Sequence, residues 1–344
     1  MTTSKDWLSI RCLLTAMATL TLTACGIDQG GNSSPPPSGA GSSTLLVSGP
    51  ITGFGSVIVN GRTIDVGNAT TLVDGNPGIE ADLREGQVIR LIAQVDGNSV
   101  NALFIEFQRN VSGAVEAVDV PADTLTVLGK TIRTDAGTRF DIPGVTRLAD
   151  LQVGELVLVS GIPAAAGEVL ATYIGAANVA EPFEISARIT ATDAPALTFE
   201  LGALTVDYSQ ALLLELPLGI PQVGQIVQVK ASTLANGVLT ADQVRALPRL
   251  PGAFSSAATQ FSTGELAAVG PGPASAPLSV SFIGFVSGEN LPAAIAVDDV
   301  AVELNAATVV VGGAQIDLLA GRRIRVDGQV LNVGAVRATR ITIF

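Results

Sequence analysis

The chain has 344 residues, of which 47% are hydrophobic, 4% aromatic and 15% charged, and its formal net charge is -12. It contains no histidine and two cysteines. The acidic charge disfavours binding to a phosphate backbone, and the lack of histidine excludes Ser–His–Asp and Cys–His centres and the commonest zinc ligand.

The N-terminus has the pattern of an export signal. Lys5 and Arg11 precede an apolar run over residues 12–23, which is too short to span a bilayer. The run ends in LTAC, which resembles the bacterial lipobox. That resemblance implies that Cys25 becomes the first residue of the mature chain and carries the lipid, whereas a plain secretory signal is the alternative. In lipoproteins of Gram-negative type, an aspartate directly after this cysteine is the usual signal for retention in the inner membrane. The resemblance therefore implies the outer membrane, because Gly26 stands at that position.

A segment rich in Gly, Ser and Pro follows the cysteine, GIDQGGNSSPPPSGAGSS, and it cannot form a hydrophobic core. We therefore expect a lipoprotein signal peptide over residues 1–24. We expect the lipidated Cys25 and a flexible, disordered tether over residues 25–47.

The rest of the chain repeats itself four times. Each repeat has a glycine followed by alternating apolar residues: GQVIRL from Gly86, GELVLV from Gly154, GQIVQV from Gly224 and GRRIRV from Gly321. An A-x-x-[IV] motif begins 16 or 17 residues after each glycine, at Ala102, Ala171, Ala241 and Ala338. Such regular spacing predicts tandem copies of one structural unit.

Each copy begins with a hairpin, as in SVIVNGRTIDV, whose Asn60-Gly61 pair is typical of a two-residue turn. The alternation predicts about five short strands per copy, without amphipathic helices longer than two turns. We expect an all-β chain of four small five-stranded barrels of OB or SH3-like type, because closure removes exposed edges. Leu156 and Leu158 make one outward strand face apolar, which predicts that a neighbouring repeat covers it.

The expected boundaries are residues 48–108, 109–178, 179–252 and 282–344 for the four repeats, with a linker or insertion over 253–281. The L-x-x-G-x-x-[IV]-x-[LV] and A-x-x-[IV] pattern resembles the repeats of bacterial exported proteins grouped as domain-of-unknown-function family 5666. The pattern is complete over residues 83–91 and 151–159. Pro221 replaces the leading leucine in the third copy. This resemblance implies architecture and export, and it implies no activity.

Few residues are candidates for catalysis. A Ser–Lys dyad would need Lys130 in a hairpin turn or Lys230 on an outward strand position, and we expect both to be solvated surface groups. The adjacent pair Asp298 and Asp299 is expected to form a hairpin corner. We predict no catalytic residue, no cofactor and no metal, so the protein is not expected to be an enzyme.

Two other kinds of site, for calcium and for nucleic acid, would depend on particular residues. Turns at Asp74-Gly75, Asp96-Gly97 and Asp327-Gly328 could offer oxygen ligands to calcium, but such turns are also ordinary hairpin signals. Arginines gather in the fourth copy at positions 322, 323, 325, 337 and 340. Phe344 is the one aromatic residue near them, so cross-strand charge pairing is favoured over nucleic-acid binding.

The sequence thus predicts a lipid-anchored protein of the bacterial cell envelope that acts as a scaffold or binding protein. Its expected partners are the membrane, through Cys25, and envelope proteins or glycans. A small-ligand, glycan or calcium-binding module is the alternative. A carboxylate-based hydrolase is a third possibility, which a deep cleft holding two carboxylates would support.

Overall fold

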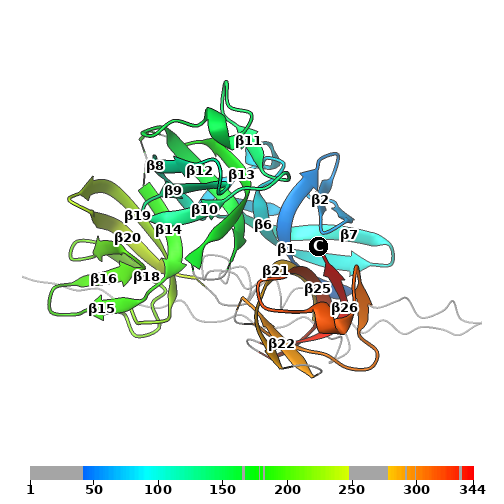
Figure 1. The fold of residues 1–344 in the computed structure, drawn as a ribbon. Helices are drawn as coiled ribbons and strands as arrows, with labels where there is room; N and C mark the ends of the chain where they lie inside the picture. The colour runs from blue at the N-terminus through cyan, green and yellow to red at the C-terminus, as the bar shows by residue number, and fades with distance from the viewer. Residues whose placement is uncertain are drawn as a thin grey trace, which may run out of the picture. The chain divides into compact units, whose positions relative to one another are not determined.

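The computed structural model describes residues 42–164, 167–177, 179–180, 183–247, 278–290, 293–298, 300–332 and 335–344. The expected signal peptide, Cys25, most of the tether and most of the expected insertion lie outside the described residues. The described part is built of β-strands with short 3-10 turns (Figure 1). None of its helical segments has the length and apolarity that a membrane-spanning helix needs.

The first two repeat regions supply the strands up to residue 176. The first contains β1 (Ser43–Gly53), β2 (Val57–Val59), β3 (Arg62–Ile64), β4 (Thr70–Val73), β5 (Asn76–Gly78), the 3-10 turn η1 (Glu80–Asp82), β6 (Val88–Asp96) and β7 (Ser99–Phe107). The second contains β8 (Val111–Asp119), β9 (Thr124–Val127), β10 (Lys130–Arg133), β11 (Arg139–Asp141), η2 (Leu148–Asp150), β12 (Leu156–Pro163) and β13 (Val169–Ala176).

The last two repeat regions follow the same order. The third contains β14 (Phe183–Arg188), β15 (Ala191–Asp193), β16 (Thr198–Leu201), β17 (Leu204–Asp207), β18 (Leu212–Leu214), β19 (Ile226–Ala235) and β20 (Val238–Ala246). The fourth contains β21 (Ser279–Asn290), β22 (Ala294–Val297), β23 (Val300–Glu303), β24 (Val309–Val311), η4 (Gln315–Asp317), β25 (Arg323–Asn332) and β26 (Ala335–Ile343). Residues 43–47, expected in the tether, are therefore part of β1, and residues 279–281, expected in the insertion, are part of β21.

The repeated glycines have a backbone reason. Gly86, Gly154, Gly224 and Gly321 precede the long strands β6, β12, β19 and β25, and their φ angles of 93°, 91°, 85° and 83° are unfavourable for residues with a side chain. The expected two-residue turn at Asn60-Gly61 is also present, since Val59 pairs with Arg62 and both turn residues have positive φ.

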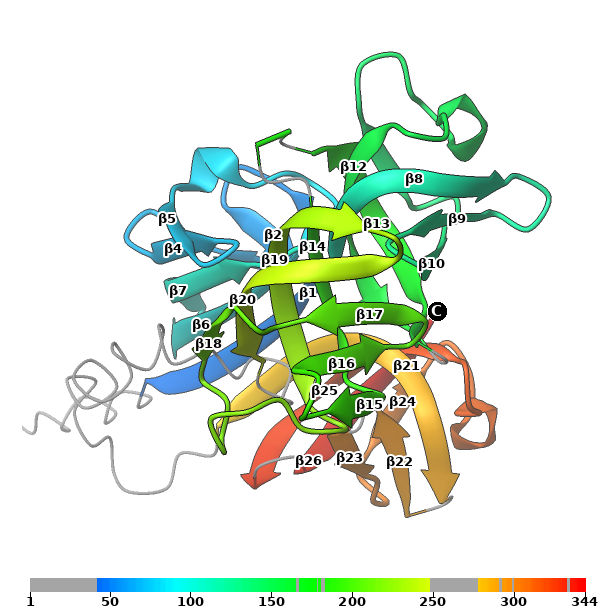
Figure 2. The same ribbon diagram turned by 90° about the vertical axis from the view of Figure 1, so that its left-hand side faces the viewer.

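The expectation of four separate small barrels is wrong. β1 pairs in parallel with β21, so the first and fourth repeats share one 13-stranded sheet. β8 pairs with β14, so the second and third repeats share another (Figures 1 and 2). The strands form a β-solenoid of about 7 turns. The physical reason is that the edges of the first strands satisfy their backbone groups by pairing across repeats.

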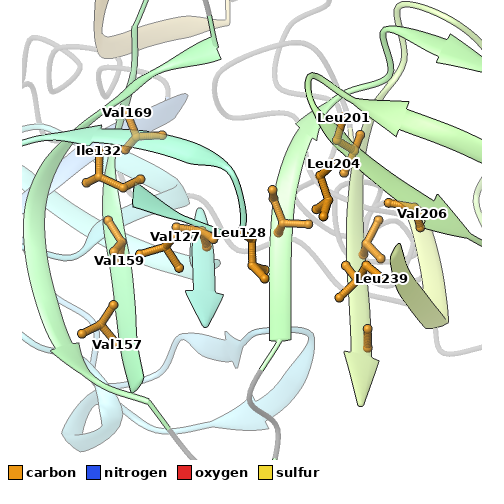
Figure 3. Close-up of a cluster of buried hydrophobic side chains, with 14 of the residues drawn as sticks. Val127, Leu128, Ile132, Val157, Val159, Val169, Leu201, Leu204, Val206 and Leu239 are labelled. Atoms are coloured by element: carbon orange, nitrogen blue, oxygen red, sulfur yellow. The ribbon is translucent and has the colours of Figure 1, made fainter. Parts of the chain in front are cut away.

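The cores follow these shared sheets. One hydrophobic cluster includes side chains of both the second and the third repeat (Figure 3), such as Ile132 and Val169 in one and Leu204 and Leu239 in the other. Leu158 of β12 packs against the core of the first repeat, which confirms the expected covering of that apolar strand face.

Candidate functional site

A pocket of about 440 Å³ is lined by residues from all four repeat regions, and we call it the junction pocket. Its charged and aromatic lining includes Arg90, Glu106, Lys130, Glu168, Phe285 and Asp298. These residues come from β6, β7, β10, the loop before β13, β21 and the turn after β22. No single repeat contains the pocket, so a site search within one repeat would miss it.

Part of the pocket lining is apolar and belongs to a small hydrophobic cluster. Ile162 and Leu170 of the second repeat pack against Phe285 of the fourth. A β-bulge between Ser160 and Gly161 turns β12 toward its neighbours. A Cβ on Gly161 would lie 2.2 Å from a backbone oxygen, so glycine is required at this bulge.

Arg90 and Glu106 form an ion pair across β6 and β7, with Nη2 and Oε2 3.0 Å apart. The Arg90 guanidinium also donates to Gln108 Oε1 at 2.8 Å. The Glu106 side chain is only 1% exposed, so the pair is shielded from solvent. The same cross-strand positions hold Leu158 and Gly175 in the second repeat, so this charged pair is not a general feature of the repeat.

The prediction that Lys130 and Lys230 are solvated surface groups is wrong. Lys130 is partly buried in the junction pocket, where its Nζ donates to the Ser186 carbonyl at 3.1 Å. Burial lowers the pKa of its ammonium to about 8. Lys230 is also partly buried and donates to the carbonyl of Asp74 in another repeat. The Ser186 hydroxyl donates to the Arg109 carbonyl at 3.3 Å, so Lys130 and Ser186 do not form a dyad.

Asp298 occupies a hairpin corner, as expected, with a φ of 49°, while Asp299 lies outside the described residues. Its carboxylate, however, folds inward over Gly284, where a Cβ would lie 2.4 Å from Oδ2. Burial raises the pKa of Asp298 to about 7, opposed by a hydrogen bond with the backbone of Phe285.

The same arrangement, a turn side chain lying over a glycine of the first strand, recurs in other repeats. Asn60 lies over Gly49 in the first repeat, where a Cβ would lie 2.3 Å from Oδ1. Leu128 lies over Gly113 in the second repeat, with its Cγ 3.0 Å from the Cβ position. In each of these repeats, a glycine in the first strand lies beneath the first residue of the following hairpin turn. This combination of glycine and turn residue is the sequence signal that could have pointed to Asp298.

A buried charge cluster adjoins the pocket at Arg109. The Arg109 guanidinium donates to Asp74, with Nε 2.8 Å from Oδ2, and the same Nε lies 3.5 Å from Glu184 Oε2. Gln228 donates to the other oxygen of Glu184. Burial and the nearby Asp74 raise the pKa of Glu184 to about 7, although Arg109 opposes the shift. We call these four residues the seam cluster, because they join the first and third repeats.

Two of the three calcium candidates have carboxylates that contact arginines. Asp74 belongs to the seam cluster, and Asp327 lies 3.2 Å from Arg325 and 3.6 Å from Arg62. Asp96 pairs with Ser99 across a hairpin turn. Among the described residues, no group of three or more His, Cys, Asp or Glu side chains is placed to hold a metal ion.

Three of the five arginines of the fourth repeat lie beside carboxylates, and one of them, Arg337, forms a cross-strand pair of the expected kind. Arg337 lies 3.3 Å from Glu303 on the neighbouring strand, which is a cross-strand pair. Arg323 lies 3.3 Å from Asp135 of the second repeat and also stacks over the Phe344 ring at 5.3 Å. The guanidinium groups of Arg323, Arg325 and Arg337 are therefore matched by carboxylates.

The repeats match a described family, "Domain of unknown function (DUF5666)", over residues 47–106, 112–175, 187–245 and 284–342, which is more than half of the chain. The chain belongs to this family. The tandem repetition and the family resemblance inferred from the sequence are thereby confirmed. A search of curated proteins returned no match.

Some site residues lie inside the DUF5666 matches, and others lie between them. Arg90, Lys130 and Asp298 lie inside the first, second and fourth DUF5666 matches, whereas Arg109 and Glu184 lie in the joints between matches. Most strand residues thus lie inside the DUF5666 matches, and Arg109 and Glu184 connect the units from the segments between the matches. Because the family description includes no activity, function has to be inferred from the junction pocket.

Proposed function

We propose that this chain is a lipid-anchored, non-enzymatic binding protein of the bacterial cell envelope, in which four DUF5666 repeats act as one unit around the junction pocket. The observation that supports binding most strongly is the junction pocket. Its volume of about 440 Å³ lies in the range of small-ligand sites, and apolar walls surround a few charged groups, as such sites require.

The anchor is proposed from the N-terminal sequence. Cys25 follows a charged and apolar signal in the order of a lipobox, and Gly26 favours the outer membrane over the inner membrane. Replacing Cys25 by serine should move the protein from the membrane fraction to the soluble fraction. If the Cys25→Ser protein stays with the membranes after a high-salt wash, the anchor proposal is wrong.

A binding role is favoured over catalysis by the way the polar groups are occupied. Arg90 is engaged with Glu106, and Lys130 with a backbone carbonyl rather than a hydroxyl. Envelope proteins and glycans remain the proposed wider partners of the displayed repeats, and nucleic acid is not proposed.

A carboxylate-based hydrolase is the second candidate, because Glu106 and Asp298 line the same pocket between repeats. The raised pKa of Asp298 suits a general acid, and a second carboxylate is the partner such chemistry needs. Hydrolysis of a panel of glycosides by the wild-type protein, abolished in the Asp298→Asn variant, would favour this candidate over binding.

Pocket occupancy tests the binding function. Ala164 lines the junction pocket beside Ile162, so Ala164→Trp should fill it. A small-molecule library screened by thermal shift should give stabilising ligands for the wild type that are lost in Ala164→Trp. Ala191→Trp, at an exposed position of β15, is the matched control and should keep them. If every ligand found also stabilises Ala164→Trp, the pocket is not the binding site.

A further inference from the structure

The charges of the junction pocket are nearly balanced. Its lining carries four cationic groups and three carboxylates. Arg90 is paired with Glu106, and Arg109 is paired with the carboxylates of the seam cluster. The remaining charged lining residues are Lys130, Asp298, Glu168 and the exposed Arg188. A ligand with a large net charge of either sign would therefore meet as much repulsion as attraction.

Two of these groups are held away from water without an opposite charge. In the described part of the chain, Lys130 and Asp298 make no ion pair, and their hydrogen bonds go to the backbone at Ser186 and Phe285. Burial disfavours the charged form of each, which lowers the pKa of Lys130 and raises that of Asp298. A ligand that brings a counter-charge to each group would compensate for the lost hydration.

The surface around these two groups is apolar. Phe285, Ile162 and Val169 line the same pocket and are buried. Val88 and Ile226 add further apolar lining. A ligand therefore needs an apolar body in addition to its two charged ends.

We infer that the junction pocket binds a short zwitterionic peptide, whose carboxylate meets Lys130, whose ammonium meets Asp298, and whose apolar side chains pack on Ile162 and Phe285. This inference rests on the proposed binding function and specifies its ligand. A phosphorylated ligand is disfavoured, because a dianion would be close to Glu106, Glu168 and Asp298 and would have Lys130 as its one unpaired partly buried cation.

The test uses the full chain and a set of apolar di- and tripeptides, measured by isothermal titration calorimetry. Each peptide is tested with free ends, with an acetylated amino end and with an amidated carboxyl end. Free peptides should bind one per chain, and blocking either end should weaken binding about tenfold or more. Because this comparison needs only the wild-type protein, it does not depend on how well any variant folds.

The variants assign each end of the peptide. Lys130→Met keeps the apolar stem, and Asp298→Asn keeps the shape and tolerates the positive φ. Each should weaken free-peptide binding about tenfold. Amidation should cost nothing further in Lys130→Met, and acetylation nothing further in Asp298→Asn. The matched controls are Arg133→Met, exposed on the same strand, and Asp123→Asn, an exposed turn residue with a φ of 55°.

The outcomes separate the ligand class from the binding function. Peptides that bind equally well with blocked ends, or that bind Lys130→Met and Asp298→Asn as well as wild type, overturn this inference. Failure of all peptides, combined with library ligands that Ala164→Trp loses, overturns the peptide class and leaves the binding function standing. If peptides fail and no library ligand depends on the pocket, both the inference and the proposed function are wrong.

Discussion

Replacing Glu184 by glutamine should remove a pH-dependent loss of stability. The Glu184 carboxyl is buried beside Asp74, and its pKa rises from the ordinary 4.5 to about 7. Because the folded state then holds the proton more tightly than the unfolded state, the stabilising contribution is complete below about pH 4.5 and is lost as the pH rises through 7.

The magnitude follows from the size of the shift. A difference between 4.5 and about 7 corresponds to roughly 3 kcal/mol of unfolding free energy lost by the wild type across that window. Glutamine does not titrate, and its Oε1 can still accept the hydrogen bond from Gln228. The Glu184→Gln variant should therefore lack this loss. Glu80→Gln, at an exposed position, should behave like the wild type.

Urea unfolding of the full chain, followed by circular dichroism at pH 5 and pH 8, measures this effect. Asp298 and other titrating groups contribute in both proteins, so the difference between wild type and variant isolates Glu184. The variant should be more stable relative to wild type at pH 8 than at pH 5. A pH dependence identical in the two proteins would refute the placement of a buried carboxylate next to Asp74.

Three further predictions test other parts of the structure. Arg109→Met should lower the unfolding free energy by about 3–5 kcal/mol, because it removes the cation that pairs with the buried carboxylates of Asp74 and Glu184. The control Arg147→Met, whose side chain is 76% exposed, should change the unfolding free energy by less than about 0.5 kcal/mol in the same assay. Gly49→Ala places a Cβ 2.3 Å from Asn60 Oδ1 and should lower the melting temperature through a cost of about 1–3 kcal/mol, while Gly288→Ala, whose nearest neighbour is 3.7 Å away, should not. Peptide affinity, measured by calorimetry from pH 5 to 10, should be greatest between about pH 7 and 8. The reason is that Asp298 loses its charge below that window and Lys130 loses its charge above it. An affinity that is flat across this range would contradict the assignment of the two groups.

Much of the local structure could be predicted from the sequence. The spacing from Gly86 to Ala102, and its recurrence, reports a positive-φ turn and two paired strands, which are local features. The hairpin at Asn60-Gly61 is local for the same reason. Leu158 also indicated correctly that another part of the chain covers its strand face.

The pairing between repeats could not be predicted in the same way. Any strand edge can pair with any other through backbone groups, so the sequences of β1 and β21 carry no side-chain signal for their parallel contact. The expectation of separate barrels failed at this point. Residues separated by many positions, such as Asp74 and Glu184, look like ordinary surface acids in the sequence. The pairing of β8 with β14 and the packing of the first repeat beside them bring both carboxylates to Arg109.

The candidate site was missed for a related reason. Lys130 and Asp298 both lie at hairpin turns, which are usually solvated, and turn chemistry explains their positions without any site. Only the contact between repeats turns these corners into the lining of one pocket. In the structure, Gly113 and Gly284 leave room for the turn residues Leu128 and Asp298.

In our proposal the four repeats act as one unit around the junction pocket. Native-state hydrogen exchange of the full chain, resolved by peptide mass spectrometry, tests it most directly when wild type is compared with Arg109→Met. If the four repeats act as one unit, this single change in the seam cluster should speed exchange in strands of all four repeats together, including β6, β12, β19 and β25. Faster exchange confined to the residues around Arg109, with the other strands unchanged, would contradict it.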